Sequence, residues 1–109
     1  ITEVTDIDGH TALHIAAAYG RDVTVKFLVT EMRNDINQVD HAGKTPLHLA
    51  SQNGFSSLHS AVMNSYLADI NAMTDIGASP LNVAACNNHL EVVNVLLEKG
   101  AHINLKTSN

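Results

Sequence analysis

The stretch at 40–54, DHAGKTPLHLASQNG, holds residue types that bind phosphate in other settings. Its Gly-Lys-Thr at 43–45 matches the end of a phosphate-binding loop, whose backbone N–H groups surround the phosphates of a nucleotide. Such a loop also needs a glycine five residues before Gly43, and Gln38 occupies that position. The sequence therefore argues against phosphate binding, and we expect Lys44 to be a solvent-facing residue of a turn.

Histidines are the second candidate source of chemistry, because imidazole binds metals and transfers protons near neutral pH. A zinc site needs three or four ligands at a recognisable spacing. His10 and His14 are four residues apart, but His10 precedes the expected start of a helix, so the two do not share a helical face. The single cysteine, Cys86, has no basic neighbours in sequence and no cysteine partner. We therefore expect no metal site.

Catalytic sets are also missing from the sequence. No serine lies in a G-x-S-x-G elbow, the turn that exposes a nucleophile. The acidic residues are scattered over expected turns and helix starts instead of forming a pair. We predict no catalytic residues, no cofactor and no enzyme activity.

The composition sets further limits on fold and partners. A chain of 109 residues, 45% of them hydrophobic, is large enough for one domain with its own core. The formal net charge of -5 disfavours a nucleic-acid partner. No apolar run approaches a membrane span and no signal peptide is evident, so we expect no membrane insertion. Together with the absence of a cysteine pair, this predicts an intracellular location, in the cytoplasm or nucleus.

The chain repeats itself with a period of 34 residues, which separates Gly9, Gly43 and Gly77. In that register DIDGHTALHIAAAYG aligns with DHAGKTPLHLASQNG and TDIGASPLNVAACNN. A second block recurs near the unit ends, as DIN at 35–37, DIN at 69–71 and HIN at 102–104. Such a period is typical of stacked units, none of which buries its apolar face alone. We predict a chain cut from a longer array, with units at 6–39, 40–73 and 74–106, the tail of a preceding unit at 1–5 and the start of a following one at 107–109.

Each unit is predicted to contain a turn, a helix, a second turn and a second helix. The first helix begins at a hydroxyl residue that can cap free N–H groups, namely Thr11, Thr45 or Ser79. Proline follows at the first helical position in two units, as Pro46 and Pro80. The helix ends at a residue that tolerates a left-handed backbone, namely Gly20, Gly54 or Asn88. Because the second helices carry apolar residues at helical spacing, we predict an all-α solenoid joined by short hairpin-like turns, without a continuous sheet.

One histidine position recurs in the repeat, where His14 and His48 align with Asn82. Metal binding or proton transfer would not survive a change to asparagine, whereas both residue types carry a hydrogen-bond donor and an acceptor. Three residues after the capping residue, either side chain can reach back to the start of its helix or across to the adjacent turn. We therefore predict a structural role for all three residues.

The remaining histidines are expected in two environments. His59 shares its repeat position with Val25 and Val93, on the packed side of the second helix. This predicts a neutral imidazole bonded to a neighbouring carbonyl, with pH sensing as the alternative. Solvent exposure is predicted for the histidines at turns or helix starts, His41, His89 and His102.

GKTPLHLA at 43–50 and HLEVVNVLLEKGAHIN at 89–104 resemble the ankyrin-repeat family, and the resemblance extends over nearly the whole chain. Gly100 supplies the glycine that this family usually has after the second helix. Met32 and Tyr66 stand in its place in the first two units, with an extra residue nearby. The resemblance implies stacked helix pairs and a hydrogen-bonding structural histidine in the first helix.

Partner contacts in this family are usually made by the tips of the turns and the exposed end of the first helix. For the first unit, the resemblance predicts contacts by Ile7, Asp8, His10, Ala18 and Tyr19. For the second unit, it predicts contacts by Val39, His41, Ala42, Lys44, Gln52 and Asn53. For the third unit, it predicts contacts by Met73, Asp75, Ile76, Ala78, Cys86 and Asn87. Apolar residues at positions expected to be exposed, such as Ile7, Tyr19 and Ile76, are typical of a contact surface.

The resemblance favours a protein-protein interaction module that binds another protein through its concave face and turn tips. One alternative is an inhibitory module that masks a transcription factor or an enzyme. A second is a substrate of asparagine hydroxylation, because Asn37, Asn71 and Asn104 match the position that is hydroxylated in some ankyrin repeats. An excess of acidic turn residues favours a basic partner segment, although Asp6 and Asp40 can instead be held in turn hydrogen bonds.

Overall fold

The computed structural model describes residues 5–56 and 68–103, and within these ranges it contains five helices and no strand. The helices are α1 (Ala12–Ala18), α2 (Asp22–Thr30), α3 (Pro46–Asn53), α5 (Pro80–Cys86) and α6 (Leu90–Glu98). The predicted all-α fold is therefore confirmed for the described residues. His59, Tyr66 and Asn104 lie outside these ranges, as does most of the expected second helix of the middle unit.

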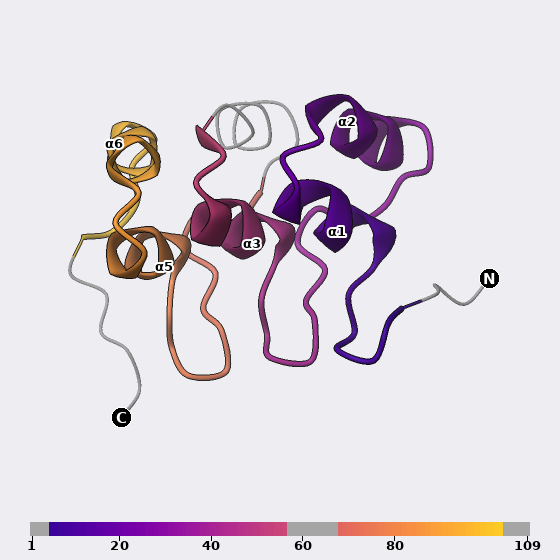
Figure 1. Cartoon of the computed structure of the whole chain (residues 1–109), viewed down its shortest axis with the longest axis horizontal. Coiled ribbons are helices and arrows are strands. Elements are labelled where there is room, and N and C mark those ends of the chain that lie inside the picture. Colours follow the sequence, from indigo (N-terminus) through magenta and orange to yellow (C-terminus); the bar gives the residue numbers. More distant parts are fainter. Residues whose placement is uncertain (1–4, 57–67, 104–109) are drawn as a thin grey trace.

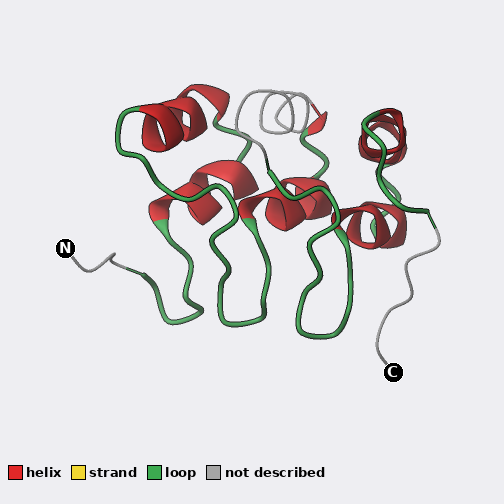
Figure 2. Ribbon diagram, turned by 180° about the vertical axis from the view of Figure 1, so that it is seen from behind, coloured by secondary structure: helices red, strands yellow, loops and turns green. Residues whose placement is uncertain are grey.

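The helices form two rows (Figure 1). In the first row α1, α3 and α5 lie side by side, and each contacts the next. In the second row α2 packs on α1, and α6 packs on α5. The view from behind shows the long turns on one side of the stack, opposite the second row (Figure 2). None of the described helices is long and apolar enough to cross a membrane.

Each first helix begins with a reciprocal pair of hydrogen bonds. The Thr11 hydroxyl accepts the backbone N–H of His14 at 3.3 Å, while Nδ1 of His14 accepts the N–H of Thr11 at 3.2 Å. The same arrangement recurs at Thr45 with His48 and at Ser79 with Asn82. Pro46 and Pro80 follow at the first position of α3 and α5. Caps of this kind stabilise a helix by about 1 kcal/mol each, and the predicted helix starts are confirmed.

The first helices end in a left-handed backbone, as predicted. Gly20, Gly54 and Asn88 have φ angles of 69°, 82° and 62°. The N–H of the following residue then bonds to a carbonyl five residues back, as Arg21 does to Ala16 at 2.9 Å. This bond satisfies one of the carbonyls that a helix end leaves free.

In the first unit, the residue equivalent to Gly100 lies one position later than the sequence alignment predicted. Arg33, not Met32, has the left-handed φ of 55° that Gly100 adopts in the third unit with φ 91°. The extra residue widens the turn after α2, because Asn34 donates to the carbonyl of Leu28, six residues back, at 3.0 Å. At the end of α6 the equivalent bond spans five residues. The expectation for Tyr66 falls outside the described residues.

Two groups of buried apolar side chains hold the stack together. The first lies between the first two units and contains Leu13, Ala16, Ala17, Val25, Ile36, Leu47 and Ala50. The second lies in the third unit and contains Leu81, Ala84, Val92 and Leu96. Alanines at the contacts between first helices let these helices approach closely. Fully burying one of the larger side chains stabilises the fold by about 1.5–3 kcal/mol.

Candidate functional site

The recurring histidines join each unit to the next. Nε2 of His14 lies 2.9 Å from the carbonyl oxygen of Lys44, and Nε2 of His48 lies 2.9 Å from that of Ala78. A carbonyl only accepts, so Nε2 carries the proton, and Nδ1 is free to accept the backbone N–H at the helix start. Both rings are therefore neutral and use both nitrogens in hydrogen bonds between the helix start and the next unit.

Burial has the same effect on both rings. It lowers the pKa of His14 and of His48, because a charged imidazole loses its hydration inside the stack. Neither ring has a free nitrogen with which to take a proton from a substrate. These histidines are therefore unsuited to general base catalysis, even though they are the most buried histidines of the described chain.

Asp6 and Asp40 shape the turns, as the sequence allowed. Oδ1 of Asp40 accepts the N–H groups of Ala42 and Lys44, both at 2.9 Å. Oδ1 of Asp6 accepts the N–H groups of two residues in the first turn, at 3.0 and 2.8 Å. These bonds lower the pKa of Asp6, the largest effect coming from the N–H of His10. Both carboxylates are thus committed to holding the chain reversal.

His10 lies between two carboxylates, which the sequence did not predict. Its Nδ1 is 3.0 Å from Oδ2 of Asp6, and its Nε2 is 3.1 Å from Oδ2 of Asp40 in the next turn. One carboxylate oxygen of Asp6, one of Asp8 and one ring nitrogen of His10 all lie within 4.8 Å of one another. The acidic residues are therefore gathered here, whereas from the sequence we expected them to be scattered. Both ring nitrogens of His10 face carboxylate oxygens, one in its own turn and one in the next, so the cluster joins the first two turns.

Two further expectations about exposure were wrong. His89 is half-buried, and its Nε2 lies 2.9 Å from the carbonyl oxygen of Gln52 in the preceding unit. Its ring covers Gly54, where an added Cβ would come within 2.8 Å of Nδ1. Lys44 is also half-buried, and its Nζ donates to Oε1 of Gln52 at 3.3 Å. The partner of His89 lies 37 residues away in the sequence, whereas the partner of Lys44 belongs to the first helix of its own unit. His41 and His102 are exposed, as predicted.

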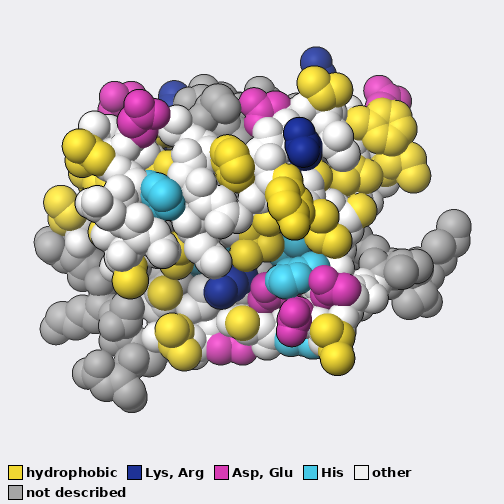
Figure 3. Space-filling view, viewed as in Figure 1, with side chains coloured by type: hydrophobic (Ala, Val, Ile, Leu, Met, Phe, Trp, Pro, Cys, Tyr) yellow, Lys and Arg dark blue, Asp and Glu magenta, His cyan; other side chains and the backbone are white. Residues whose placement is uncertain are grey.

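None of the seventeen predicted contact residues is buried. Most of them line two hollows on one side of the first row of helices, which we call the concave face. In the space-filling view, acidic and histidine side chains lie beside one another over the turns (Figure 3). Ile7, Val39 and Met73 are exposed near the turns but do not line these two hollows.

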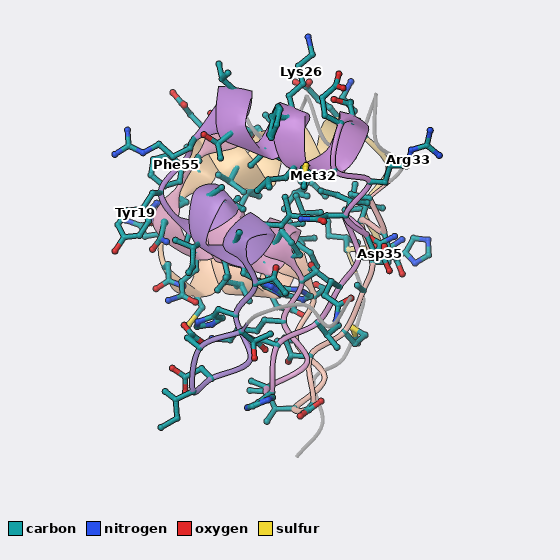
Figure 4. The ribbon with its side chains drawn as sticks, turned by 90° about the vertical axis from the view of Figure 1, so that its right-hand side faces the viewer. Tyr19, Lys26, Met32, Arg33, Asp35 and Phe55 are labelled. Atoms are coloured by element: carbon teal, nitrogen blue, oxygen red, sulfur yellow. The ribbon has the colours of Figure 1, made fainter. Side chains whose placement is uncertain are left out.

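The first hollow lies between the first and second units. Its predicted members are His10, Ala18, Tyr19, Gln52 and Asn53. The structure adds Asp6, His14, Ile15, Leu49 and Phe55. Phe55 and Tyr19 point to the same side of the molecule, and Arg33 projects from the opposite side (Figure 4).

The second hollow lies between the second and third units. Its predicted members are Ala42, Lys44, Gln52, Asp75, Ile76, Ala78, Cys86 and Asn87. The structure adds Thr74, Asn82 and Val83. Ile15 and Val83, which share one position of the repeat, were not among the predicted contact residues. Leu49 at the same position is 7% exposed, whereas Ile15 is 45% exposed because no described residue covers it.

The DIN asparagines also link successive units. Oδ1 of Asn37 accepts the N–H of Asp69 at 2.7 Å, and Oδ1 of Asn71 accepts the N–H of His102 at 3.0 Å. Each asparagine therefore connects the end of its own unit to the end of the next. The third asparagine of this series, Asn104, lies outside the described residues.

Stacked helix pairs joined by projecting turns define a helical repeat solenoid. A family model described as ankyrin repeats, three copies, matches residues 1–58 and 34–107. The chain therefore belongs to the ankyrin-repeat family. No curated protein matches the chain significantly. Members of this family are generally protein-protein interaction modules and are typically not catalytic.

Proposed function

We propose that this protein binds a segment of another protein through the concave face. The geometry supports this function because side chains from all three units converge on one surface. Gln52 lines both hollows, so the first and second hollows form one continuous surface. The concave face is therefore the surface best suited to contact a partner along the stack.

Exposed apolar side chains beside the hollows carry this proposal. Tyr19 is 66% exposed and Ile76 is 70% exposed, in the first and third units respectively. Large apolar groups in contact with water, surrounded by polar residues, mark interaction sites. Aromatic side chains contribute most to such interfaces, and the repeat position of Tyr19 otherwise holds only Asn53 and Asn87.

The test is a change of Tyr19, His41 and Ile76 together to alanine. All three side chains are exposed, so the fold should be retained. Proteins captured from a cell lysate by the unchanged chain should bind the triple variant roughly tenfold more weakly or not at all. Circular dichroism of both proteins should show the same helix content.

A matched variant changes Lys26 and Asn94 to alanine. Both residues are exposed and belong to the second-row helices. Loss of the partner through this variant alone would place the site on the second row and refute the proposal. The captured partner also tests the inhibitory alternative, which a transcription factor or enzyme that loses activity on binding would support.

Asparagine hydroxylation is a second candidate, because Asn37 is exposed. Its amide is used between units, so we propose a structural role for Asn37 and Asn71 first. A hydroxyl group on Cβ would leave Oδ1 able to accept the same N–H. Intact mass of protein purified from its native cell, greater by one oxygen atom, would support the modification. An unmodified mass would leave these residues with the structural role alone.

A further inference from the structure

The side chain of Gln52 forms a ridge between the two hollows. Ala18, Gln52 and Cys86 occupy equivalent positions, so a long side chain stands between two small ones. Lys44 supports the ridge by donating to Oε1 of Gln52. The hollow on the Ala18 side has a volume of about 670 Å³, and the hollow on the Cys86 side about 530 Å³. Each volume can accept an apolar side chain.

The spacing of the hollows selects the conformation of a bound segment. One hollow lies between α1 and α3, and the other between α3 and α5. They are therefore offset by one helix spacing, which is about 8–10 Å for packed helices. A polyproline-II segment has three residues per turn and rises about 3.1 Å per residue, which places side chains i and i+3 on one face about 9 Å apart. A β-strand places same-face side chains about 7 or about 13 Å apart. Of these two extended conformations, only the polyproline-II segment has a spacing that fits both hollows.

A helical segment fits less well because of the ridge. Helix positions i and i+7 are about 10.5 Å apart, which also matches the two hollows. However, positions i+3 and i+4 lie on the same face between them, directly over the ridge. A polyproline-II segment has no side chain on that face between i and i+3. Nε2 of Gln52 donates to no described residue, so it can donate to a carbonyl of such a segment.

Acidic side chains on the turn side of the hollows indicate that the partner segment carries a positive charge. Asp6, Asp8 and Asp75 are exposed along this edge, whereas Asp40 is buried. Lys44, the only basic residue of the second hollow, is already bonded to Gln52. A basic side chain between the two apolar ones would meet these carboxylates.

We propose that the concave face binds a polyproline-II-like segment of a partner protein. Its apolar side chains, three residues apart, occupy the two hollows, and a basic side chain between them faces the turn carboxylates. The inference rests on the proposed function and specifies its partner. It also assigns the specificity to the small residues Ala18 and Cys86 on either side of Gln52.

Labelled peptides provide the probe, and fluorescence anisotropy measures their Kd for the whole chain. The reference peptide contains Leu-Pro-Arg-Leu flanked by alanine and glycine. Peptides of the same composition with leucines two or four residues apart should bind about tenfold more weakly, because one leucine stays in water. Replacing the arginine with glutamate should weaken binding further, and added salt should reduce that difference.

Variants that fill the hollows locate the bound peptide. Ala18→Leu and Cys86→Leu should each lower affinity for the reference peptide to that of a peptide with a single leucine. Lys26→Ala, on the second row, should leave the Kd unchanged, and circular dichroism should show that all three variants keep their helices. Hollow-filling variants that bind the reference peptide as tightly as the unchanged chain would overturn the inference.

Other outcomes separate this inference from the proposed function. Equal affinity for every leucine spacing, tighter binding of a helical peptide with leucines seven apart, or no binding of any peptide would refute the polyproline-II partner. The proposed function would still stand if the Tyr19, His41 and Ile76 variant loses its captured partner. It would fail if that variant kept the captured partner and the Lys26 and Asn94 variant alone lost it.

Discussion

His14 illustrates how one side chain serves two structural tasks at the residue scale. Its Nδ1 accepts the N–H of Thr11, and its Nε2 donates to the carbonyl of Lys44, which also accepts the N–H of Asp40. The Thr11 N–H has no second hydrogen-bond partner of this kind among the described residues, because it lies at the start of the helix. The two bonds of His14 therefore differ in what their loss would cost.

Two substitutions of His14 separate these bonds. His14→Asn keeps an acceptor for Thr11, as Asn82 does for Ser79, so we expect a loss of stability of about 1 kcal/mol. His14→Leu leaves a buried N–H unpaired and should cost about 2–3 kcal/mol. Urea denaturation measures both values, and His41→Leu serves as the exposed control. Equal losses for the two variants would show that the Thr11 bond contributes little.

The buried histidines also predict how stability depends on pH. Burial lowers the pKa of His14 and His48 from 6.5, while in the unfolded chain both rings regain that ordinary value. Just below pH 6.5 the unfolded chain therefore binds more protons, and stability falls as the pH falls. Their contribution is complete above about pH 6.5 and is lost toward the lower folded-state pKa.

Urea denaturation between about pH 7.5 and about pH 5 tests this slope. The free energy of unfolding should decrease toward the acid end for the unchanged chain. A variant that combines His14→Asn with His48→Asn should show a flatter dependence, because its amides do not titrate. An identical slope in both proteins would assign the pH dependence to other groups.

At the scale of the element, the end of α2 shows how an extra residue is accommodated. The helix closes with a wider turn, and Arg33 adopts the left-handed backbone that Gly100 adopts after α6. This conformation is unfavourable for any residue with a Cβ atom. The Arg33 side chain projects away from the body of the molecule (Figure 4). The backbone, and not the side chain, decides the energetics of this position.

Arg33→Gly should therefore stabilise the protein by about 1 kcal/mol, since glycine adopts the left-handed conformation without strain. The measurement is the midpoint and slope of urea denaturation. Arg33→Ala is the matched control, because it removes the same charge and keeps the strained Cβ. A gain for alanine as large as that for glycine would trace the effect to charge.

At the scale of the whole molecule, stability comes from contacts between neighbouring units. The two buried clusters lie in different parts of the stack, and the third unit joins the rest through the contact of α3 with α5. In such a linear arrangement a unit at one end can open while the others stay folded.

Leu96→Ala tests this independence, because Leu96 is fully buried in the second cluster. The substitution should cost about 2–5 kcal/mol. Hydrogen exchange should increase in α5 and α6, while α1 keeps its protection. Leu90→Ala, at an exposed position of the same helix, should change neither region. Equal loss of protection in α1 would show that the units unfold as one.

The sequence alone determined the fold class, the three-unit period, and the first helices' starts and ends. These features depend on residues close together in the chain. A Thr or Ser followed three positions later by His or Asn closes its own cap, and Gly54 or Asn88 ends its helix through its own backbone. The period showed which residues are equivalent, so it also aligned His14 and His48 with Asn82.

Only the tertiary structure decided what each side chain meets in the next unit. His10 lies against Asp40, His89 bonds to Gln52, and Ile15 is exposed where Leu49 is covered. It also placed the left-handed residue at Arg33, because an extra residue can be absorbed at several points of a turn. Equivalent positions share a place in the repeat but not a neighbour. Their exposure and partners follow from contacts between units, which periodicity does not encode.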